Sequence, residues 1–315
     1  MKLINKKEFS LTEQELKDLR KNGYVGPFDL YEPEEIKAIW RKERLRLLDR
    51  SNAIYKENTI SENTNIANYD RHLDNEFLAK HICKPQIVHK LNSLLGENLI
   101  CWRSEFFPKY PGDEGTDWHQ ADTFENAGGK PQLIWPDSTS FGGTLSVWTA
   151  FTDTNKDTAC LQFIPETHEE MFYDEHKEME YNPEKNANLE RNGERKGFFG
   201  YDYRNLQKDP DWEPDESKAV SIEMKAGQFV IFWSTLMHAS HAHKGVSNQM
   251  RLGYSVRYVP SIVDIYPDLE EITQFGGRVS LENYGTVVVS GENMNPKNKV
   301  KIKTMGGNSF KGFMK

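Results

Sequence analysis

The sequence has few cysteines, no long apolar run and no excess of positive charge. Its three cysteines, Cys83, Cys101 and Cys160, form no Cys-X-X-Cys pair, so neither a disulfide framework nor a zinc cage is expected. No stretch approaches the roughly 20 apolar residues of a membrane span, and the N-terminus lacks the apolar core of a signal peptide. The net charge of -8 argues against nucleic-acid binding. These absences predict a cytoplasmic protein without membrane or nucleic-acid partners.

The pattern along the chain predicts a mainly β protein with flanking helices. Residues 10–50 have helical spacing, interrupted by the stretch NGYVGPFD, and a second helix is expected to start near Glu34. From about residue 98, short alternating or aromatic-rich runs separated by Gly, Pro, Asp and Asn indicate antiparallel strands. Because the helices are segregated to one end and no glycine-rich nucleotide loop follows a strand, a double-stranded β-helix (jelly roll) is favoured over a βαβ fold.

We expect a single domain over residues 1–315. Its parts are a helical buttress at 1–97, a jelly-roll core carrying the candidate site at 98–290, an insertion at 169–218 and a C-terminal tail at 295–315 that is expected to fray. The polar composition of the insertion is typical of a solvated excursion, whereas its aromatic cluster favours an active-site lid. That cluster consists of Phe198, Phe199, Tyr201 and Tyr203.

The stretch GTDWHQADTF, at 115–124, contains half of a candidate iron site. Side chains alternate along a strand, so His119 and Ala121 share one face while Gln120 and Asp122 share the other. A facial triad of two histidines and one carboxylate needs its carboxylate beside the first histidine, where alanine stands here. Asp122 would reach a metal only if a β-bulge redirected it.

The stretch KAGQFVIFWSTLMHASHAH supplies a second metal ligand. It offers His238, His241 and His243. His238 directly follows an apolar strand and is preferred, whereas the other two fall in a polar loop, where an exposed histidine is the ordinary expectation.

Two arginines share one face of the alternating strand RLGYSVRYV. A guanidinium suits a small carboxylate, so Arg251 is expected to bind the distal carboxylate of an oxo-diacid, and Arg257 another anion or ordered water. The strand GTLSVWTAF is expected to present Thr144, Ser146 and Trp148 on one face. Each residue alone has an ordinary structural explanation, such as a surface ion pair or core packing, and only the combination indicates a site.

Five stretches together resemble a known enzyme family: FFPKYPGDEGTDWHQADTF, GGTLSVWTAFTD, CLQFIPETH, RKGFFGYDYRNLQ and AGQFVIFWSTLMHAS. They are similar to the non-haem iron(II)/2-oxoglutarate aliphatic halogenases of the syringomycin-biosynthesis type, a branch of the phytanoyl-CoA dioxygenase superfamily. The resemblance runs from about residue 100 to residue 285. It is specific, because hydroxylases of the superfamily carry His-X-Asp where this chain has His119-Gln120-Ala121.

This resemblance implies iron(II) held by His119 and His238, chloride bound to iron in the gap at Ala121, and 2-oxoglutarate and O2 as cosubstrates. The implied 2-oxoglutarate residues are Arg251, Thr116, Phe107 and Trp148. The implied chloride and water network comprises Asn126, Ser146 and Arg257, with serine where a family member has threonine. Glu105 and Phe199 match positions near the substrate.

The implied reaction is chlorination of an unactivated aliphatic carbon in an aminoacyl group of threonine, 2-aminobutyrate, valine or leucine type. The resemblance places that group on a phosphopantetheinylated carrier protein in nonribosomal peptide biosynthesis. Two alternatives stay open, namely a hydroxylase that uses Asp122 and a non-catalytic jelly-roll binding module. Chloride carries the negative charge of the missing carboxylate, which favours the halogenase, and a binding module has no need of His119, His238 and Arg251 together.

Overall fold

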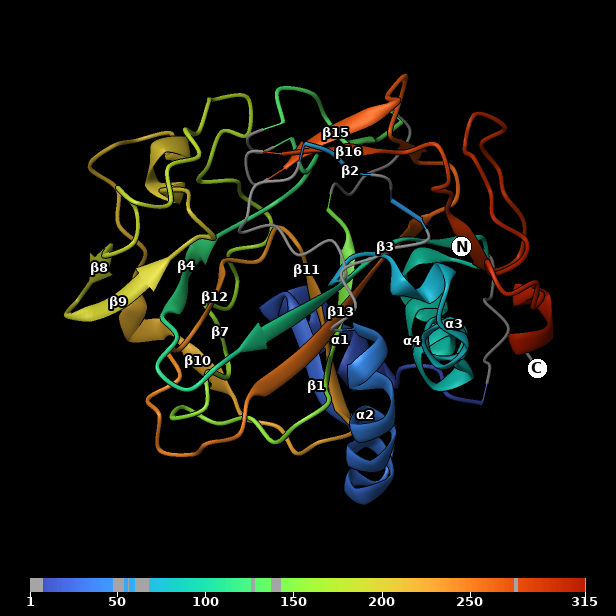
Figure 1. The fold of residues 1–315 in the computed structure, drawn as a ribbon, viewed down its shortest axis with the longest axis horizontal. Coiled ribbons are helices and arrows are strands. Elements are labelled where there is room, and N and C mark those ends of the chain that lie inside the picture. The colour runs from blue at the N-terminus through green and yellow to red at the C-terminus, as the bar shows by residue number, and fades with distance from the viewer. Residues whose placement is uncertain are drawn as a thin grey trace.

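The computed structural model describes residues 8–47, 54–55, 57–59, 68–125, 128–136, 143–274 and 277–314. Two six-stranded sheets form its body (Figure 1). The first is ordered β1 (Tyr24–Asp29), β11 (Gln228–Trp233), β6 (Leu145–Ala150), β13 (Arg251–Pro260), β3 (Leu99–Lys109) and β17 (Val287–Ser290). The second is ordered β10 (Val220–Ile222), β7 (Leu161–Phe163), β12 (His238–Ser240), β4 (Gly115–His119), β9 (Glu194–Gly197) and β8 (Glu190–Arg191). The prediction of a mainly β jelly roll is confirmed.

Smaller elements complete the fold. One small sheet pairs β14 (Asp264–Ile265) with β5 (Leu133–Ile134), and another is ordered β15 (Glu271–Gln274), β16 (Gly277–Ser280) and β2 (Glu57–Thr59). The α-helices are α1 (Glu13–Asn22), α2 (Pro33–Leu47), α3 (Glu76–Ile82) and α4 (Pro85–Leu95). Short 3-10 helices are η2 (Arg71–Leu73), η3 (Tyr203–Leu206), η4 (Glu216–Lys218) and η5 (Phe310–Phe313). In Figure 1 the second sheet lies at the left, and α3 and α4 at the right.

Alternation along β3 gives the first sheet two different faces. Phe106 packs 6.3 Å from Trp40 of α2, between ring centroids, and Ser104 bonds to His72 of η2. The intervening residues, such as Glu105, line a cavity on the other face. Because side chains alternate along a strand, one face of the sheet packs on the helices and the other is left for a site.

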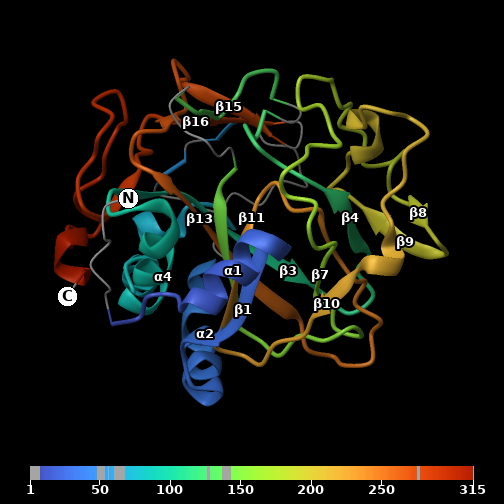
Figure 2. The same cartoon turned by 180° about the vertical axis from the view of Figure 1, so that it is seen from behind.

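The N-terminal segment is only partly helical. Thr12 caps α1 in a capping box with Glu15, as expected of a helix start. The stretch NGYVGPFD, which interrupts the helical pattern, contains β1, and this strand pairs with β11 at the edge of the first sheet. Figure 2 shows α1 beside β1. The N-terminal segment therefore supplies a strand to the core as well as helices outside it.

The C-terminal segment packs on the protein instead of fraying as expected. Phe310 is 2% exposed in the hydrophobic core, and the backbone N–H of Met305 donates to the carbonyl of Leu73. The three cysteines are buried and unpaired, as expected without a disulfide framework. No helix among the described residues is long and apolar enough to cross a membrane.

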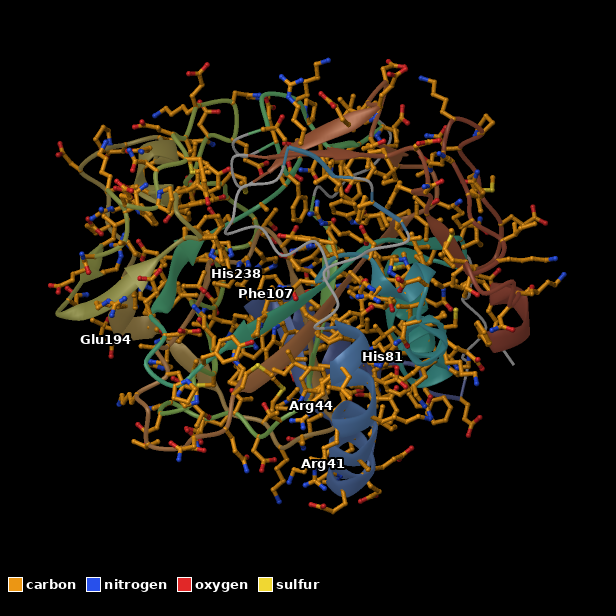
Figure 3. The ribbon with its side chains drawn as sticks, viewed as in Figure 1. Arg41, Arg44, His81, Phe107, Glu194 and His238 are labelled. Atoms are coloured by element: carbon orange, nitrogen blue, oxygen red, sulfur yellow. The ribbon has the colours of Figure 1, made fainter. Side chains whose placement is uncertain are left out.

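Two fully buried histidines between the sheet and the helices make stability depend on pH. His81, labelled in Figure 3, bonds to Tyr31 and Thr149, and His72 bonds to Ser104. Burial lowers the pKa of each to about 3. Between that value and the unfolded pKa of about 6.5, the unfolded chain binds more protons than the folded protein, so stability rises with pH in this window.

We therefore expect the free energy of unfolding to fall as the pH drops below about 6.5, by up to about 1.4 kcal/mol per pH unit for each histidine. His81→Asn should lower stability at every pH. It should also reduce the dependence of the unfolding free energy on pH by the contribution of one histidine. Urea unfolding of both proteins over a pH series measures the difference. Equal slopes in the two proteins would contradict a neutral buried His81.

Candidate active site

A cavity of about 150 Å³ is lined by residues of both sheets and of the insertion. Figure 3 shows two of its lining residues, His238 and Phe107, close together near the middle of the molecule. Several predicted site residues line it: Glu105, Phe107, Thr116, His119, Ala121, Ser146, Trp148, Phe199, His238, Arg251 and Arg257. The fold thus brings together side chains that lie far apart in the sequence.

The two histidines selected from the sequence face each other across neighbouring strands. His119 ends β4 and is in register with His238, which begins β12, and their ring centroids are 3.9 Å apart. The Nδ1 atoms lie 2.8 Å from the carbonyl of Asp117 and 2.7 Å from that of Leu236. A carbonyl only accepts, so each Nδ1 carries the proton and each Nε2 keeps its lone pair for a metal.

Both imidazoles are neutral at physiological pH. Desolvation lowers the pKa of His119 to about 4 and that of His238 well below its ordinary value, and the charge of Arg257 adds to the effect in both. A metal binding here displaces no proton from either ring. Within the described residues, no group of three or more histidine, cysteine or carboxylate side chains could hold a metal.

Position 121 lies two residues beyond His119, the last residue of β4, and lines the same cavity as the two histidines. Ala121 lines the cavity, and its backbone N–H donates to the carbonyl of Ser234 at 2.9 Å. The amide of Gln120 points away and donates to three backbone carbonyls. Asp122 accepts a hydrogen bond from Gly143 N at 2.8 Å, burial raises its pKa, and it does not line the cavity. A metal at the two histidines therefore has a methyl group beside it in place of a carboxylate.

Arg251 is a buried cation that forms no ion pair with the described carboxylates. It is 2% exposed, donates to the carbonyl of Phe107 at 2.9 Å, and leaves its Nε without a partner. Desolvation lowers the pKa of Arg251 to about 10, so it is still a cation at neutral pH. Burying an uncompensated charge is costly, and a carboxylate ligand would compensate it with two parallel hydrogen bonds.

Trp148 forms a wall beside this cation. The Arg251 guanidinium lies 5.4 Å from the centre of the indole, and a Cβ at Gly253 would lie 1.8 Å from the indole Cζ2. Glycine on β13 is what allows the indole to cross that strand. Thr116 lines the cavity from β4 and donates its backbone N–H to Ser240 Oγ at 3.1 Å. The arginine and the indole thus lie together, and Thr116 lines the same cavity.

Arg257 lies in a second charged group. Both of its terminal nitrogens are 3.2 Å from Glu105 Oε2, and its guanidinium is 5.2 Å from the centre of the Phe124 ring. Ser146 is its register partner on β6 and lines the same cavity. Glu105, expected near a substrate, is thus also the ion-pair partner of Arg257. Ser146 adds an uncharged hydroxyl donor beside this pair.

The insertion forms a wall of the cavity and is tied to β4. Arg191 donates to Asp117 at 2.8 Å, and the Tyr173 hydroxyl donates to the carbonyl of Trp118 at 2.9 Å. This attachment contradicts a purely solvated excursion, whereas opening and closing as a lid stays a prediction. The predicted aromatic cluster contributes four lining residues: Phe198, Phe199, Tyr201 and Tyr203.

Of the three candidate histidines, His238 alone lines the cavity. The expectation that His243 is exposed is wrong: it is 1% exposed, and its Nε2 lies 3.0 Å from the carbonyl of Gln249. His241 is half-buried, with its Nε2 2.9 Å from Ser221 Oγ. His243 is satisfied within its own loop and His241 by Ser221 of β10, which composition alone does not reveal.

The predictions for Thr144 and Asn126 are not confirmed by the structure. Thr144 does not share the cavity face with Ser146, because β6 begins only at Leu145 and the Thr144 hydroxyl instead accepts from Trp102 Nε1 at 3.3 Å. Asn126 lies outside the described residues, so its place in a chloride network stays a prediction.

Sequence reasoning missed two cations in the cavity, Arg103 and Lys109. Arg103 donates to Gln132 at 2.9 Å, and desolvation lowers the pKa of Lys109 to about 8, with the nearby Arg251 adding to the effect. Both lie on the same face of β3 as Glu105, at even spacing along the strand. The two-residue period of the strand was therefore the signal that could have found them.

Known proteins resemble this chain in sequence and fold. A model of the phytanoyl-CoA dioxygenase family (PhyH) matches residues 19–252. The solved structure of CytC3 with Fe(II) and alpha-ketoglutarate is 40% identical, has a TM-score of 0.72, and the match covers 96% of this chain and 97% of that one. Another CytC3 structure is 42% identical, with a TM-score of 0.73 and the same coverage.

A more distant structure, the non-heme monooxygenase ThoJ in its apo form, is 17% identical with a TM-score of 0.61. The match covers 95% of this chain and 91% of ThoJ, and at this identity it supports the fold alone. No curated protein matches the sequence.

Proposed function

The chain belongs to the phytanoyl-CoA dioxygenase family, and from that premise we propose that it is an iron(II)/2-oxoglutarate-dependent halogenase. It is an enzyme of the iron(II)/2-oxoglutarate oxygenase superfamily, and similarity to CytC3 with Fe(II) and alpha-ketoglutarate supports the same two cofactors here. The observation that carries the halogenase proposal is Ala121, a methyl group beside the two neutral histidines.

The histidine pair fits iron(II). His119 and His238 would bind it through Nε2, since their Nδ1–H groups are engaged with backbone carbonyls. When bound, the iron activates O2 at the expense of 2-oxoglutarate, which becomes succinate and CO2, and enables removal of hydrogen from an aliphatic carbon. The protein's part is to hold both rings neutral and fixed in orientation before any ligand arrives.

Three residues support chloride as the remaining ligand. Ala121 brings a methyl group to the cavity of the histidines, Ser146 offers a hydroxyl, and Arg257 offers a guanidinium whose charge is shared with Glu105. Chloride restores the single negative charge that a carboxylate would bring. The hydroxylase alternative needs the carboxylate of Asp122, which instead accepts from Gly143 outside the cavity lining. The observed contacts therefore favour the halogenase.

Arg251 supports 2-oxoglutarate as the cosubstrate. Its buried guanidinium lacks a carboxylate partner among the described residues, and Trp148, Thr116 and Phe107 line the cavity around it. A dicarboxylate with one end at the metal and the other at Arg251 would neutralise this charge. The residues thus fit a keto diacid better than a neutral ligand.

For the substrate, we propose an aminoacyl group of threonine, 2-aminobutyrate, valine or leucine type on a phosphopantetheinylated carrier protein. The sequence resemblance to carrier-dependent halogenases supports this. Phe199, 41% exposed, lines the same cavity as the histidines, so the cavity meets solvent there, while Glu105 lies inside at 7% exposed. In the reaction, chloride and one proton are consumed, a chlorine replaces one hydrogen of the aminoacyl group, and O2 and 2-oxoglutarate end as water, succinate and CO2.

The first test is the visible absorption band that iron(II) and 2-oxoglutarate form together without oxygen. We expect chloride to strengthen binding of both and to shift the band, because chloride completes the set of metal ligands. Panels of aminoacyl carrier proteins, analysed by mass spectrometry after addition of O2, then identify the substrate. A band that forms fully and unchanged without halide would refute chloride as a ligand.

A further inference from the structure

One carboxylate of the insertion is bound to the loop that follows Ala121. Glu175 is 6% exposed, and its Oε2 accepts from Asp122 N at 3.0 Å, Thr123 N at 2.7 Å and Thr123 Oγ1 at 2.9 Å. Its Oε1 accepts from Phe124 N at 3.1 Å. Successive backbone N–H groups that converge in this way form an anion site, and here the protein's own carboxylate fills it.

The loop held by Glu175 connects the two parts of the proposed chloride site. It begins directly after Ala121 and ends at Phe124, whose φ of 56° lies in the left-handed region that residues with a side chain rarely adopt. The Phe124 ring supports the Arg257 guanidinium at 5.2 Å and packs 5.0 Å from the Trp102 ring. An uncommon backbone conformation persists only where its surroundings enforce it.

We propose that Glu175 is a positioning residue for halide binding. In a site with a carboxylate at position 121, the bond to the metal would fix this loop. Ala121 forms no such bond, and Glu175 fixes the loop from the other side through the three backbone N–H groups that follow. This inference rests on the proposed function, since it concerns the geometry of the same chloride site.

The role of Glu175 predicts a specific loss. Glu175→Ala removes every acceptor, and Glu175→Gln places an NH2 donor against a backbone N–H in either amide orientation, because both carboxylate oxygens accept. Glu178→Gln is the matched control, since this residue is in the same insertion, loses the same charge and is exposed. Thr123→Val removes the hydroxyl that donates to Glu175 and accepts from Glu125 N at 3.4 Å, and it tests the same contact with the least disturbance of folding.

The experiment measures the apparent Kd for chloride from the halide-dependent change in the iron(II)/2-oxoglutarate band. Loss of hydrogen bonds to a charged group should raise it about tenfold or more in Glu175→Ala. Glu175→Gln and Thr123→Val should give smaller rises, and Glu178→Gln none. The ratio of chlorinated to hydroxylated product should fall in the same order. Without iron, amide hydrogen exchange at residues 122–124 should be faster in both Glu175 variants.

Three results would overturn the inference. If the Glu175 variants melt at a lower temperature but keep the parent's chloride Kd and product ratio, the residue is only structural. If exchange at residues 122–124 is unchanged, the loop does not depend on Glu175. If the parent protein itself shows no chloride dependence, the proposed function fails first, and this result is separable because it appears before any variant is compared.

Discussion

Replacing Ala121 by aspartate is expected to abolish chlorination and to remove the chloride dependence of the iron(II)/2-oxoglutarate band. The new carboxylate would enter the cavity that His119 and His238 line, where it would complete a two-histidine, one-carboxylate triad. A tethered ligand competes at a far higher effective concentration than free chloride, so halide occupancy should fall by at least about 10³-fold. Product analysis and anaerobic absorption spectra measure both effects.

Ala121→Gly is the matched control, because it changes the same position without introducing a metal ligand. This variant should keep a chloride-dependent band. The Ala121→Asp protein, for its part, should still bind iron. Chlorinated product from Ala121→Asp at a rate near the parent's would show that chloride binds elsewhere. The halogenase assignment would then lose its main support.

Replacing Arg251 by glutamine should weaken 2-oxoglutarate binding with little effect on folding. Removing one partner of a buried, hydrogen-bonded charge pair costs about 3–5 kcal/mol, which corresponds to a rise of roughly 10²- to 10³-fold in the apparent Kd of the cosubstrate. Since the buried guanidinium has no ion-pair partner among the described residues and keeps only one hydrogen bond, to the Phe107 carbonyl, its loss should reduce the stability of the free protein little. Titration of 2-oxoglutarate without oxygen, together with thermal melting, separates the two quantities.

Two variants sharpen this test. Arg251→Lys keeps the charge but loses the planar pair of donors, so we expect an intermediate Kd. Arg278→Gln removes an exposed arginine that pairs with Glu271 on the surface and should leave the Kd unchanged. An unchanged Kd in Arg251→Gln would place the distal carboxylate at another cation, with Lys109 the next candidate in the cavity.

The predictable part of the site followed from the two-residue period of its strands. That period placed Arg251 with Arg257 on β13, and both line the cavity in the structure. It worked because a half-buried strand in a sheet has little freedom to rotate its side chains. Ala121, which the same period placed with His119, also lines the cavity, although β4 already ends at His119. The same rule gave the wrong face for Thr144, because that residue precedes the strand and the alternation does not yet apply.

The parts that the sequence did not reveal depend on contacts between distant segments. Glu175 binds amides more than 50 residues earlier, and nothing around it in the polar insertion distinguishes it from neighbouring glutamates. His243 is buried although its loop is polar, because the backbone of that loop satisfies its ring. Phe310 packs into the core although lysines surround it in sequence. The composition of a segment gives only its average polarity, whereas the burial of each side chain depends on its own contacts.

Each histidine ring has a hydrogen bond to the main chain that no side chain supplies. Each ring donates to the carbonyl two residues before it, the same local arrangement on two different strands. Aromatic rings pack on both as well, with Phe198 4.8 Å from His119 and Phe232 5.1 Å from His238. A substitution at position 121 would leave both main-chain hydrogen bonds in place. Such independence makes the site modular: a lineage of these enzymes can exchange carboxylate for halide at position 121 in one mutational step, and a designer can attempt the reverse.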